Sequence, residues 1–397
     1  MGPVIWFPGH EKQLGTIASA TNCSLFDENG KRYTDLESGV WCTSVGHAHP
    51  RILGVMAEQA ARLAHTGFSY STRVVEAAAE EILALHGFEG GACTFLCSGS
   101  EAVEYGVRTA RQLSERPLFL TMSDSYFGAY GSASTRSTDH WTHFDWSGCD
   151  TCPHAGPCGS TCPTWEKIPF GRIGAFLFEP GSSSGFVRFP PEKLINGIAR
   201  TVRQNGGLLI VNEVTTGIGR TGRWFGYQHY DVTPDIVAMG KGIGNGYPVS
   251  VAAFSGTVTK RLNATPVPYA QSHQNDPLGA AIAREVIRII HDDNLIRRSS
   301  ELSTLLTQEL LAMRKKRRLQ AFRARGLMVA MDIEDLPGAP VTDRIHHRLL
   351  DEGYVVGRRP GTNTLRIDPS LTIEEKDLQG FLTTFDALLA AEETDHA

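Results

Sequence analysis

The stretch that decides the fold of this chain is residues 208–246, LLIVNEVTTGIGRTGRWFGYQHYDVTPDIVAMGKGIGNG. It contains two short apolar runs, at 208–213 and 236–239, joined by a segment rich in glycine and polar residues. Short apolar runs bounded by turn signals are typical of buried strands. Lys241 follows the second run and precedes a glycine-rich turn, which lets the backbone approach a ligand closely. The stretch therefore predicts a buried sheet with a lysine at the end of one strand.

Further apolar runs of the same character lie on both sides of this stretch, at 93–97, 118–122, 173–179 and 250–255. Segments with a helical spacing of apolar residues, such as 100–115 and 191–205, separate them. Strands without polar alternation that alternate with helices are typical of a mainly parallel sheet covered on both faces. We therefore expect an α/β fold in which ligands bind at the carboxyl ends of the strands.

The C-terminal third has a different pattern. A helical segment runs from about 277 to 318, and strand signals (327–333, 354–356, 365–367) then mix with helix signals (341–352, 373–391). This order predicts a small α+β domain. We expect three parts: an N-terminal segment at 1–50 that belongs to the small domain and the substrate pocket, a large domain at 51–295 with an insertion at 149–162, and a small C-terminal domain at 296–397.

Composition bounds the class of protein. The 397 residues and 41% hydrophobic content suffice for a sizeable core. A formal charge of −5 gives no sign of a nucleic-acid or membrane surface. No apolar run approaches the roughly 18 residues of a membrane span, and residues 1–15 lack the pattern of a secretory signal. We expect a cytoplasmic protein whose eight cysteines are thiols or metal ligands.

Residues 208–246 and the turn CSGSE at 97–101 resemble the class III (ornithine/4-aminobutyrate-type) aminotransferases, which use pyridoxal phosphate (PLP). The resemblance extends from about Gly15 to Ala390. It implies PLP fold type I, in which a large αβα domain with a mainly parallel sheet carries a small α+β C-terminal domain. It also implies a homodimer with shared active sites. Lys241 stands where the family forms its Schiff base with the cofactor, and the same lysine would move the α-proton.

The phosphate group of the cofactor has two candidate partners. Ser98, Gly99 and Ser100 match the phosphate-binding turn of the family, and a helix N-terminus at this turn would offer free N–H groups. An ordinary helix N-cap is the alternative interpretation of these serines. Ser272 stands where the family supplies a threonine to the phosphate across the dimer interface.

Around the ring of the cofactor, the sequence departs from the family. Tyr126 matches the aromatic residue that lies over the PLP ring, with a simple core residue as the alternative. Asn212 replaces the aspartate beside the pyridine nitrogen, so it can hydrogen-bond this nitrogen but cannot supply a charge. Thr215 replaces a glutamine near the phenolic oxygen. Glu213 is no substitute for the missing charge, because adjacent strand residues point to opposite faces.

Two residues are candidates for binding the substrate. Arg366 resembles the family arginine that holds the substrate α-carboxylate through two parallel hydrogen bonds. In members that accept ω-amines, a glutamate pairs with this arginine; here Ser184 replaces that glutamate, and Ser182 stands in place of a nearby glutamine. We therefore expect Arg366 to stay available for an α-amino acid or α-keto acid. Trp41 lies in an N-terminal segment that resembles one lining the substrate pocket.

The expected function is that of a PLP-dependent aminotransferase with amino acid and keto acid substrates. A PLP-dependent epimerase or racemase, decarboxylase or lyase acting on an amino acid is the alternative, since such a reaction can tolerate a less electron-poor ring. A non-catalytic PLP-binding relative is the third possibility. Retention of Lys241, the phosphate turn and Arg366 argues against this third possibility. We expect no nucleic-acid and no membrane partner.

Four cysteines lie close together in the insertion GCDTCPHAGPCGSTCP: Cys149, Cys152, Cys158 and Cys162. A CxxC pair followed by two more cysteines can surround one tetrahedral zinc ion with thiolates. A cysteine-ligated iron–sulfur cluster is the second possibility, and an irregular loop with free thiols is the third. A metal here would order the loop and would take no part in the chemistry.

Overall fold

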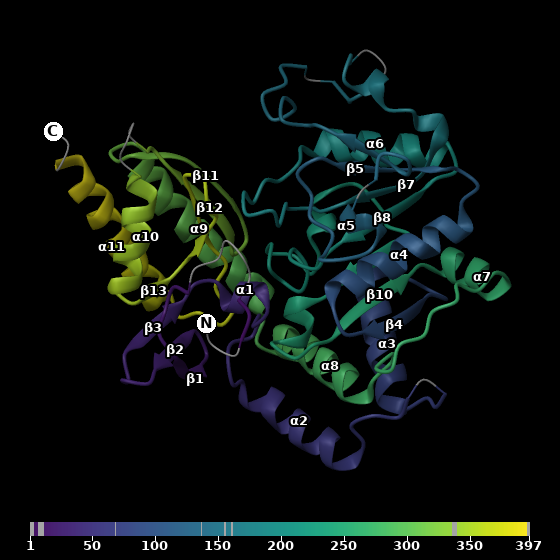
Figure 1. The fold of residues 1–397 in the computed structure, drawn as a ribbon, viewed down its shortest axis with the longest axis horizontal. Coiled ribbons are helices and arrows are strands. Elements are labelled where there is room, and N and C mark those ends of the chain that lie inside the picture. The colour runs from purple at the N-terminus through teal and green to yellow at the C-terminus, as the bar shows by residue number, and fades with distance from the viewer. Residues whose placement is uncertain are drawn as a thin grey trace.

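A seven-stranded sheet forms the centre of the larger half of the molecule (Figure 1). The computed structural model describes residues 4–6, 12–67, 69–135, 137–154, 156–159, 162–335 and 340–394, without the side chain of residue 394. In spatial order the strands are β4 (Ala92–Leu96), β10 (Ser250–Phe254), β9 (Ile236–Met239), β8 (Leu208–Asn212), β7 (Ile173–Phe178), β5 (Leu118–Met122) and β6 (Trp141–Phe144). β10 is antiparallel to both neighbours, and the other pairs are parallel. The expected mainly parallel α/β sheet is confirmed.

The strand predictions fail at one edge of this sheet. Every predicted apolar run of the large sheet forms a strand within one residue of its expected ends, whereas β6 was not predicted. Only Trp141 and Phe144 of its four residues are buried, and His143 is exposed. Its short pattern therefore resembles a loop, and its pairing with β5 is what makes it a strand.

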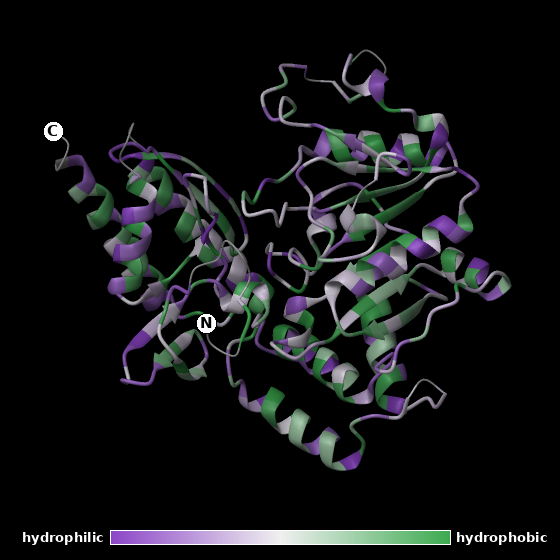
Figure 2. Ribbon diagram, viewed as in Figure 1, coloured by the Kyte–Doolittle hydropathy of each residue, from purple (hydrophilic) through white to green (hydrophobic). Residues whose placement is uncertain are grey.

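Helices cover both faces of the sheet, because its central strands are apolar on both sides. On one face, alternate strand residues such as Phe119, Leu177 and Ile210 pack with the buried side of α4 (Gly99–Leu113). On the other face, residues such as Phe176, Leu209 and Val237 pack with three further helices. These are α3 (Arg73–His86), α6 (Glu192–Gln204) and α8 (Pro277–Asp292). Figure 2 shows the apolar strands between helices that carry hydrophilic residues on their outer sides.

The smaller half of the molecule contains two four-stranded sheets, drawn on the left in Figure 1. One has the order β1 (Ile17–Thr21), β2 (Ser24–Asp27), β3 (Arg32–Asp35) and β13 (Tyr354–Val355). The other has the order β11 (Leu319–Arg325), β12 (Met328–Ile333), β15 (Thr364–Ile367) and β14 (Gly357–Arg358). Because β13 pairs in parallel with β3, the N-terminal segment joins the C-terminal part through backbone hydrogen bonds. The three-part division of the chain remains a prediction, and residues 1–3 and 7–11 of its first part lie outside the described residues.

The predicted helical segment from 277 to 318 is wrong as a single element. It divides into α8 and α9 (Leu295–Arg314), because Asn294 adopts a left-handed backbone (φ 52°) that ends one helix and begins the next. The residues after α9 form the unpredicted strand β11. Asparagine visits this conformation at lower cost than most residues, so the break is local in origin.

The remaining elements connect these layers. They are α1 (Ser38–Trp41), α2 (Pro50–Arg62), α5 (Ser132–Thr135), α7 (Gly256–Ala264), α10 (Val341–Asp351), α11 (Glu375–Thr394), and the 3₁₀ turns η1 (Trp165–Lys167), η2 (Phe170–Arg172), η3 (Gly226–His229) and η4 (Lys241–Gly244). No helix among the described residues combines the length and apolar character needed to cross a bilayer.

Candidate active site

Five strands of the large sheet deliver polar side chains to the same edge. Ser98 follows β4, Tyr126 follows the turn after β5, Glu179 follows β7, Asn212 ends β8 and Lys241 follows β9. These strands run in the same direction, so their carboxyl ends meet at one edge, where α/β sheets bind ligands. A built Cβ on Gly240 would lie 3.1 Å from the Cα of Gly99, which shows how closely the ends of β9 and β4 approach.

Lys241 has a strained backbone. Its φ of 48° lies in the left-handed region, which costs a non-glycine residue about 1–3 kcal/mol and is common at functional sites. The next residue, Gly242, is held so closely that an added Cβ would lie 2.2 Å from Oγ of Ser44. Burial lowers the pKa of Lys241, while the thiol of Cys42 and the carboxyl of Glu179 raise it. A lysine with a lowered pKa is a better nucleophile and base near neutral pH.

Trp41 is presented by a run of left-handed backbone. The φ angles of Ser38, Gly39, Val40 and Trp41 are 45°, 56°, 60° and 64°, so this turn has the opposite hand to an ordinary helix. Valine and tryptophan rarely adopt this conformation, because their side chains crowd the backbone. Val40 remains 48% exposed at the tip of the turn. The backbone of this turn is therefore strained, and it positions the indole of Trp41 and the isopropyl group of Val40 at the site.

The indole of Trp41 is the contact point of two cations. The Nζ of Lys241 lies 4.7 Å from the ring centroid, and the Cζ of Arg366 lies 3.8 Å from it. Cation–π contacts of this kind contribute about 0.5–2 kcal/mol each. The structure thus brings Lys241 and Arg366, the residues expected to handle an amino group and a carboxylate, to one indole ring and one cavity, although they are 125 residues apart in sequence.

The expectation that Arg366 stays available is wrong. Its Nη2 donates a hydrogen bond to Oε1 of Glu37 at 2.9 Å, and its Nε lies 2.6 Å from Oδ2 of Asp368. Asp368 is fully buried, whereas the side chain of Glu37 is 22% exposed. Ser184 carries no charge, as expected. Glu37 instead provides a carboxylate for Arg366, and the sequence did not predict this contact. The pair joins residues 329 apart in sequence, and no local pattern signals such a contact.

Asn212 lies beside a buried carboxyl group, that of Glu179. Its Nδ2 lies 3.1 Å from the carbonyl oxygen of Tyr126 and 3.3 Å from Oε1 of Glu179. Glu179 does cap the neighbouring loop, since it accepts hydrogen bonds from the backbone N–H of Tyr126 and from Oγ of Ser183. Burial raises the pKa of Glu179 to about 7. The position of Glu179 directly after a buried strand is the sequence feature that could have identified it as a site residue.

Glu213 points away from this group, as expected from strand geometry. Its carboxylate accepts hydrogen bonds from Oγ1 of Thr216 and from the backbone N–H groups of Gly226 and Tyr227. The same fully buried environment raises its pKa to about 7. Glu213 therefore stabilises the loop after β8 on the face opposite to Asn212.

The turn at 98–100 caps α4. The Oγ of Ser98 accepts a hydrogen bond from the N–H of Glu101, and the carboxylate of Glu101 accepts one from the N–H of Ser98. The Oγ of Ser100 accepts a hydrogen bond from the N–H of Ala129. The N-cap interpretation is thus correct for Ser98. It is compatible with a ligand at the same helix end, because the first turn of a helix has several N–H groups without helical partners.

Two buried hydroxyl groups at the site have no hydrogen-bond partner among the described residues: Oγ1 of Thr215 and Oγ of Ser184. A buried polar group without a partner costs about 1–3 kcal/mol. Thr215 follows β8 directly after Val214, whose side chain fills the space beside Gly99 and Gly240. Ser184 also lines the cavity described next, whereas Thr215 does not.

A cavity of about 580 Å³ lies beside the strand ends, although Ser98, Glu179, Asn212 and Thr215 are not part of its lining. Its lining includes Lys241, Trp41, Tyr126, Glu37 and Arg366. Its volume lies in the usual range for small-molecule sites, roughly 300–1,000 Å³. A larger hollow of about 760 Å³ lies among α2, α3 and α8, but none of the strand-end residues described above lines it.

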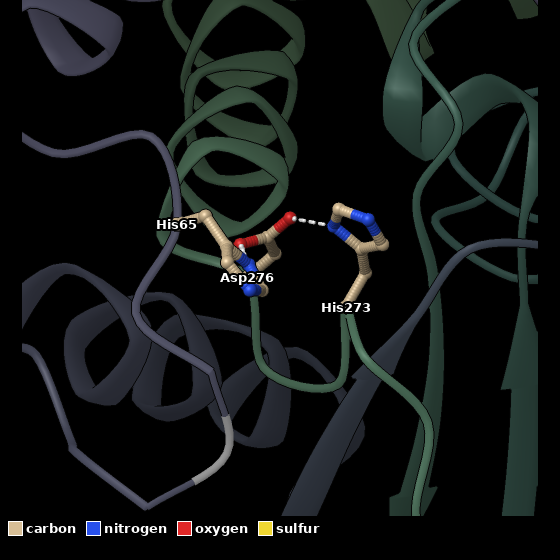
Figure 3. Close-up of side chains that lie close together, drawn as sticks. All are labelled: His65, His273 and Asp276. Atoms are coloured by element: carbon tan, nitrogen blue, oxygen red, sulfur yellow. Dashed lines mark hydrogen bonds and ion pairs between the residues drawn. The ribbon is translucent and has the colours of Figure 1, made fainter.

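Ser272 lies outside this cavity. It is exposed on a turn that precedes α8, next to a cluster of His65, His273 and Asp276 (Figure 3). Each carboxylate oxygen of Asp276 lies 2.8 Å from the Nδ1 of one histidine. Among the described residues, His65, His273 and Asp276 are the group of potential metal ligands whose donor atoms all lie within 4.8 Å of one another. Since both imidazoles already bond the carboxylate, the cluster supports the turn that carries Ser272.

The four cysteines of the insertion meet around one small cavity. Cys149, Cys152, Cys158 and Cys162 all line a space of about 240 Å³, together with Trp165 and Lys193. All four are free thiols. Backbone N–H groups of Trp165 and Thr164 bond the sulfur of Cys162 and lower its pKa, whereas burial raises the pKa of Cys149 to about 11. The tertiary structure thus brings the four cysteines to one cavity, although no three of their sulfur atoms lie within 4.8 Å of one another.

The family model "Aminotransferase class-III" matches residues 7–148 and 165–389. The gap between the two matched parts contains the cysteine insertion, so the four cysteines are no part of the family pattern. The matched parts contain all of the strand-end residues, Trp41 and Arg366.

Individual relatives agree with the family match. The acetylornithine aminotransferase of Mycobacterium tuberculosis is 30% identical over 376 residues, which cover 94% of this chain and 91% of that protein. The leucine/methionine racemase of Thermococcus litoralis is 28% identical over 94% of this chain and 89% of its own length. The taurine:2-oxoglutarate aminotransferase of Bifidobacterium kashiwanohense, solved with PLP and glutamate, superposes with a TM-score of 0.88 at 21% identity, covering 99% of this chain and 96% of that one. The chain belongs to the class III aminotransferases, PLP-dependent transferases of fold type I.

Proposed function

We propose that this protein transfers an amino group between an α-amino acid and an α-keto acid, with PLP bound at the strand ends and Lys241 as its covalent partner. The observation that carries this proposal is the shared contact of Lys241 and Arg366 with the indole of Trp41. An α-amino acid carries its amino group and its carboxylate on one carbon, so a site for it needs an amine-reactive lysine and a carboxylate-binding cation close together.

The residues present fit PLP. The N-terminus of α4 at Ser98, Gly99 and Ser100 would hold the phosphate group, and the free hydroxyl of Thr215 would bond the phenolic oxygen. The ring of Tyr126 is 49% exposed and lines the cavity, so it can cover one face of the cofactor. When bound, PLP withdraws electrons from the α-carbon of the substrate.

The chain itself supplies binding, orientation and proton transfer. Arg366 would bind the substrate carboxylate through its planar fork of N–H groups after Glu37 has moved aside. Lys241, whose pKa is lowered by burial, would take the α-proton and return it at a neighbouring atom. Trp41 and Val40 would exclude water from one side of the substrate.

Ser272 would serve a second copy of the chain. It is exposed and lies outside the cavity of its own chain, which suits a residue that reaches the phosphate of a partner in a homodimer. We further propose a cytoplasmic location. Sedimentation of the wild type as a dimer, and a higher Kd for PLP in Ser272→Ala, would support the shared site. A fully active monomer would overturn it.

An amino-acid racemase is the second candidate function. It is favoured by the neutral side chain of Asn212 and by the match to a leucine/methionine racemase. Incubation of the PLP-loaded protein with a panel of amino acids separates the candidates. Conversion of the cofactor to its pyridoxamine form, with release of a keto acid, supports the aminotransferase. Racemisation without this conversion supports the racemase, and neither reaction would indicate a non-catalytic relative.

We also propose that Cys149, Cys152, Cys158 and Cys162 bind one structural zinc ion. The support is their shared cavity and the N–H groups that bond the sulfur of Cys162, an arrangement that stabilises thiolate ligands. Elemental analysis should find one zinc per chain, lost in Cys149→Ser and retained in the control Cys93→Ser. A brown protein with iron and sulfide would indicate an iron–sulfur cluster instead, and a metal-free, fully active protein would overturn the site.

A further inference from the structure

The amide group of Asn212 has a fixed orientation. Its Nδ2 lies 3.1 Å from the carbonyl oxygen of Tyr126, which can only accept a hydrogen bond. Its Oδ1 lies 3.1 Å from the backbone N–H of Val214, which can only donate one. Exchanging the two atoms of the amide would break both bonds. The assignment therefore holds whatever the protonation state of Glu179.

In this orientation, the amide of Asn212 can form only one further hydrogen bond. Both N–H groups of the amide are directed to Tyr126 and Glu179, at 3.1 and 3.3 Å. The oxygen has two lone pairs, and Val214 uses one of them. Asn212 can therefore accept one more hydrogen bond but has no free donor. A neutral pyridine nitrogen is an acceptor and would gain nothing from this side chain, whereas a protonated one is a donor.

Glu179 holds the amide in this orientation and lies close enough to polarise it. The carboxyl group is 2% exposed, and its other partners are the N–H of Tyr126 at 2.8 Å and Oγ of Ser183 at 2.6 Å. These three contacts fix it between the loop after β5 and the loop after β7. A hydrogen bond from an amide to an ionised carboxylate makes the amide oxygen a stronger acceptor, because bonds in a chain polarise one another.

We propose that Glu179 is a positioning residue for the cofactor: through Asn212 it presents an amide oxygen to the pyridine nitrogen of PLP and keeps that nitrogen protonated. This inference rests on the proposed function, since it takes the position of the ring from the family. It assigns the role of the missing aspartate to two residues together, one that makes the contact and one that supplies the charge. A protonated ring is the stronger electron sink, so the inference favours amino-group transfer over racemisation.

The test uses the PLP-loaded protein with a ¹⁵N label in the pyridine ring and reads the protonation of that nitrogen by NMR across a pH series. In the wild type, the label should report a protonated nitrogen at pH 8, which lies above the pKa of about 7 of Glu179, so that the carboxyl is ionised. Glu179→Gln removes the charge, and Asn212→Leu removes the acceptor. Each should lower the protonated-to-neutral ratio at a given pH about tenfold, the effect of losing one charge-assisted bond.

Glu213→Gln is the matched control, because Glu213 is an equally buried carboxyl that faces away from Asn212. It should leave the ratio unchanged. A neutral nitrogen in the wild type, or an unchanged ratio in both Glu179→Gln and Asn212→Leu with PLP still bound, would overturn the inference. Failure of the wild type to bind PLP would instead overturn the proposed function, so the two failures are distinguishable.

Discussion

Glu37 and Arg366 form an ion pair of 2.9 Å inside the candidate active site, although they are 329 residues apart in sequence. Glu37 precedes the left-handed turn that carries Trp41, and Arg366 lies on β15 of the small domain. The second partner of Arg366, Asp368, is fully buried. A substrate carboxylate must therefore compete with Glu37, the more exposed of the two carboxylates.

Glu37→Gln should lower KM for substrates that carry an α-carboxylate by about tenfold, since the substrate would no longer displace a charged partner from Arg366. This corresponds to about 1.4 kcal/mol. KM for an amine without a carboxylate should stay the same. Steady-state kinetics with one substrate of each kind measures both values, and the exposed Glu28→Gln on the same N-terminal segment is the control. Equal changes in KM for both substrates would show that Glu37 does not compete for Arg366.

Gly357→Ala should disturb the same pair without touching the cofactor. A Cβ at this position would lie 2.7 Å from Oε1 of Glu37 and 2.9 Å from Nε of Arg366. Such crowding costs about 1–3 kcal/mol and forces the side chains to move. We expect KM for carboxylate substrates to rise at least about tenfold while kcat changes little. Gly54→Ala in α2, where no atom lies within 4 Å of the added carbon, is the control. Unchanged KM would mean that the pair adapts freely.

Lys241→Ala should abolish the amino-group transfer. Loss of a positioned proton-transfer group costs about 10²–10⁴-fold, and the covalent link to the cofactor is lost as well. We expect at least about a 10³-fold lower single-turnover rate, measured by stopped-flow absorbance with an amino acid. The exposed Lys260→Ala on α7 should keep the wild-type rate. A Lys241→Ala protein with near-normal turnover would require a different base.

Glu213 should make the protein less stable as the pH rises. Its pKa is raised by burial from an ordinary value of 4.5 to about 7, so between these values the folded state binds more protons than the unfolded state. The free energy of unfolding therefore falls as the pH rises through this window. The contribution of Glu213 amounts to about 3 kcal/mol.

Urea unfolding of wild type and Glu213→Gln at pH 5 and pH 8, both saturated with PLP, tests this contribution. Glutamine loses some hydrogen bonds to Thr216, Gly226 and Tyr227, so the variant should be the less stable protein at pH 5. The deficit should shrink by up to about 3 kcal/mol at pH 8. A deficit that stays constant or grows with pH would contradict the assigned pKa.

Local sequence patterns were sufficient for much of the fold and part of the site. The apolar runs predicted six of the seven strands of the large sheet, since a strand buried on both faces has a composition that no loop shares. The motif around Lys241 and the turn at 98–100 identified the cofactor family, because a strand end followed by glycines or a helix N-cap is a short-range feature. The short edge strand β6 and the break at Asn294 were missed, because pairing in one case and a single backbone conformation in the other decide them.

The sequence by itself determined the chemistry available to this protein: a lysine, an arginine, a phosphate turn and a neutral residue where the family has an acid. Only the tertiary structure decided how these groups act on one another. It paired Arg366 with Glu37, placed Glu179 against Asn212 and fixed the amide so that its oxygen is the free atom. The physical reason is that charge and hydrogen bonding in a buried site depend on distances of a few ångströms between residues far apart in the chain, and sequence spacing carries no record of those distances.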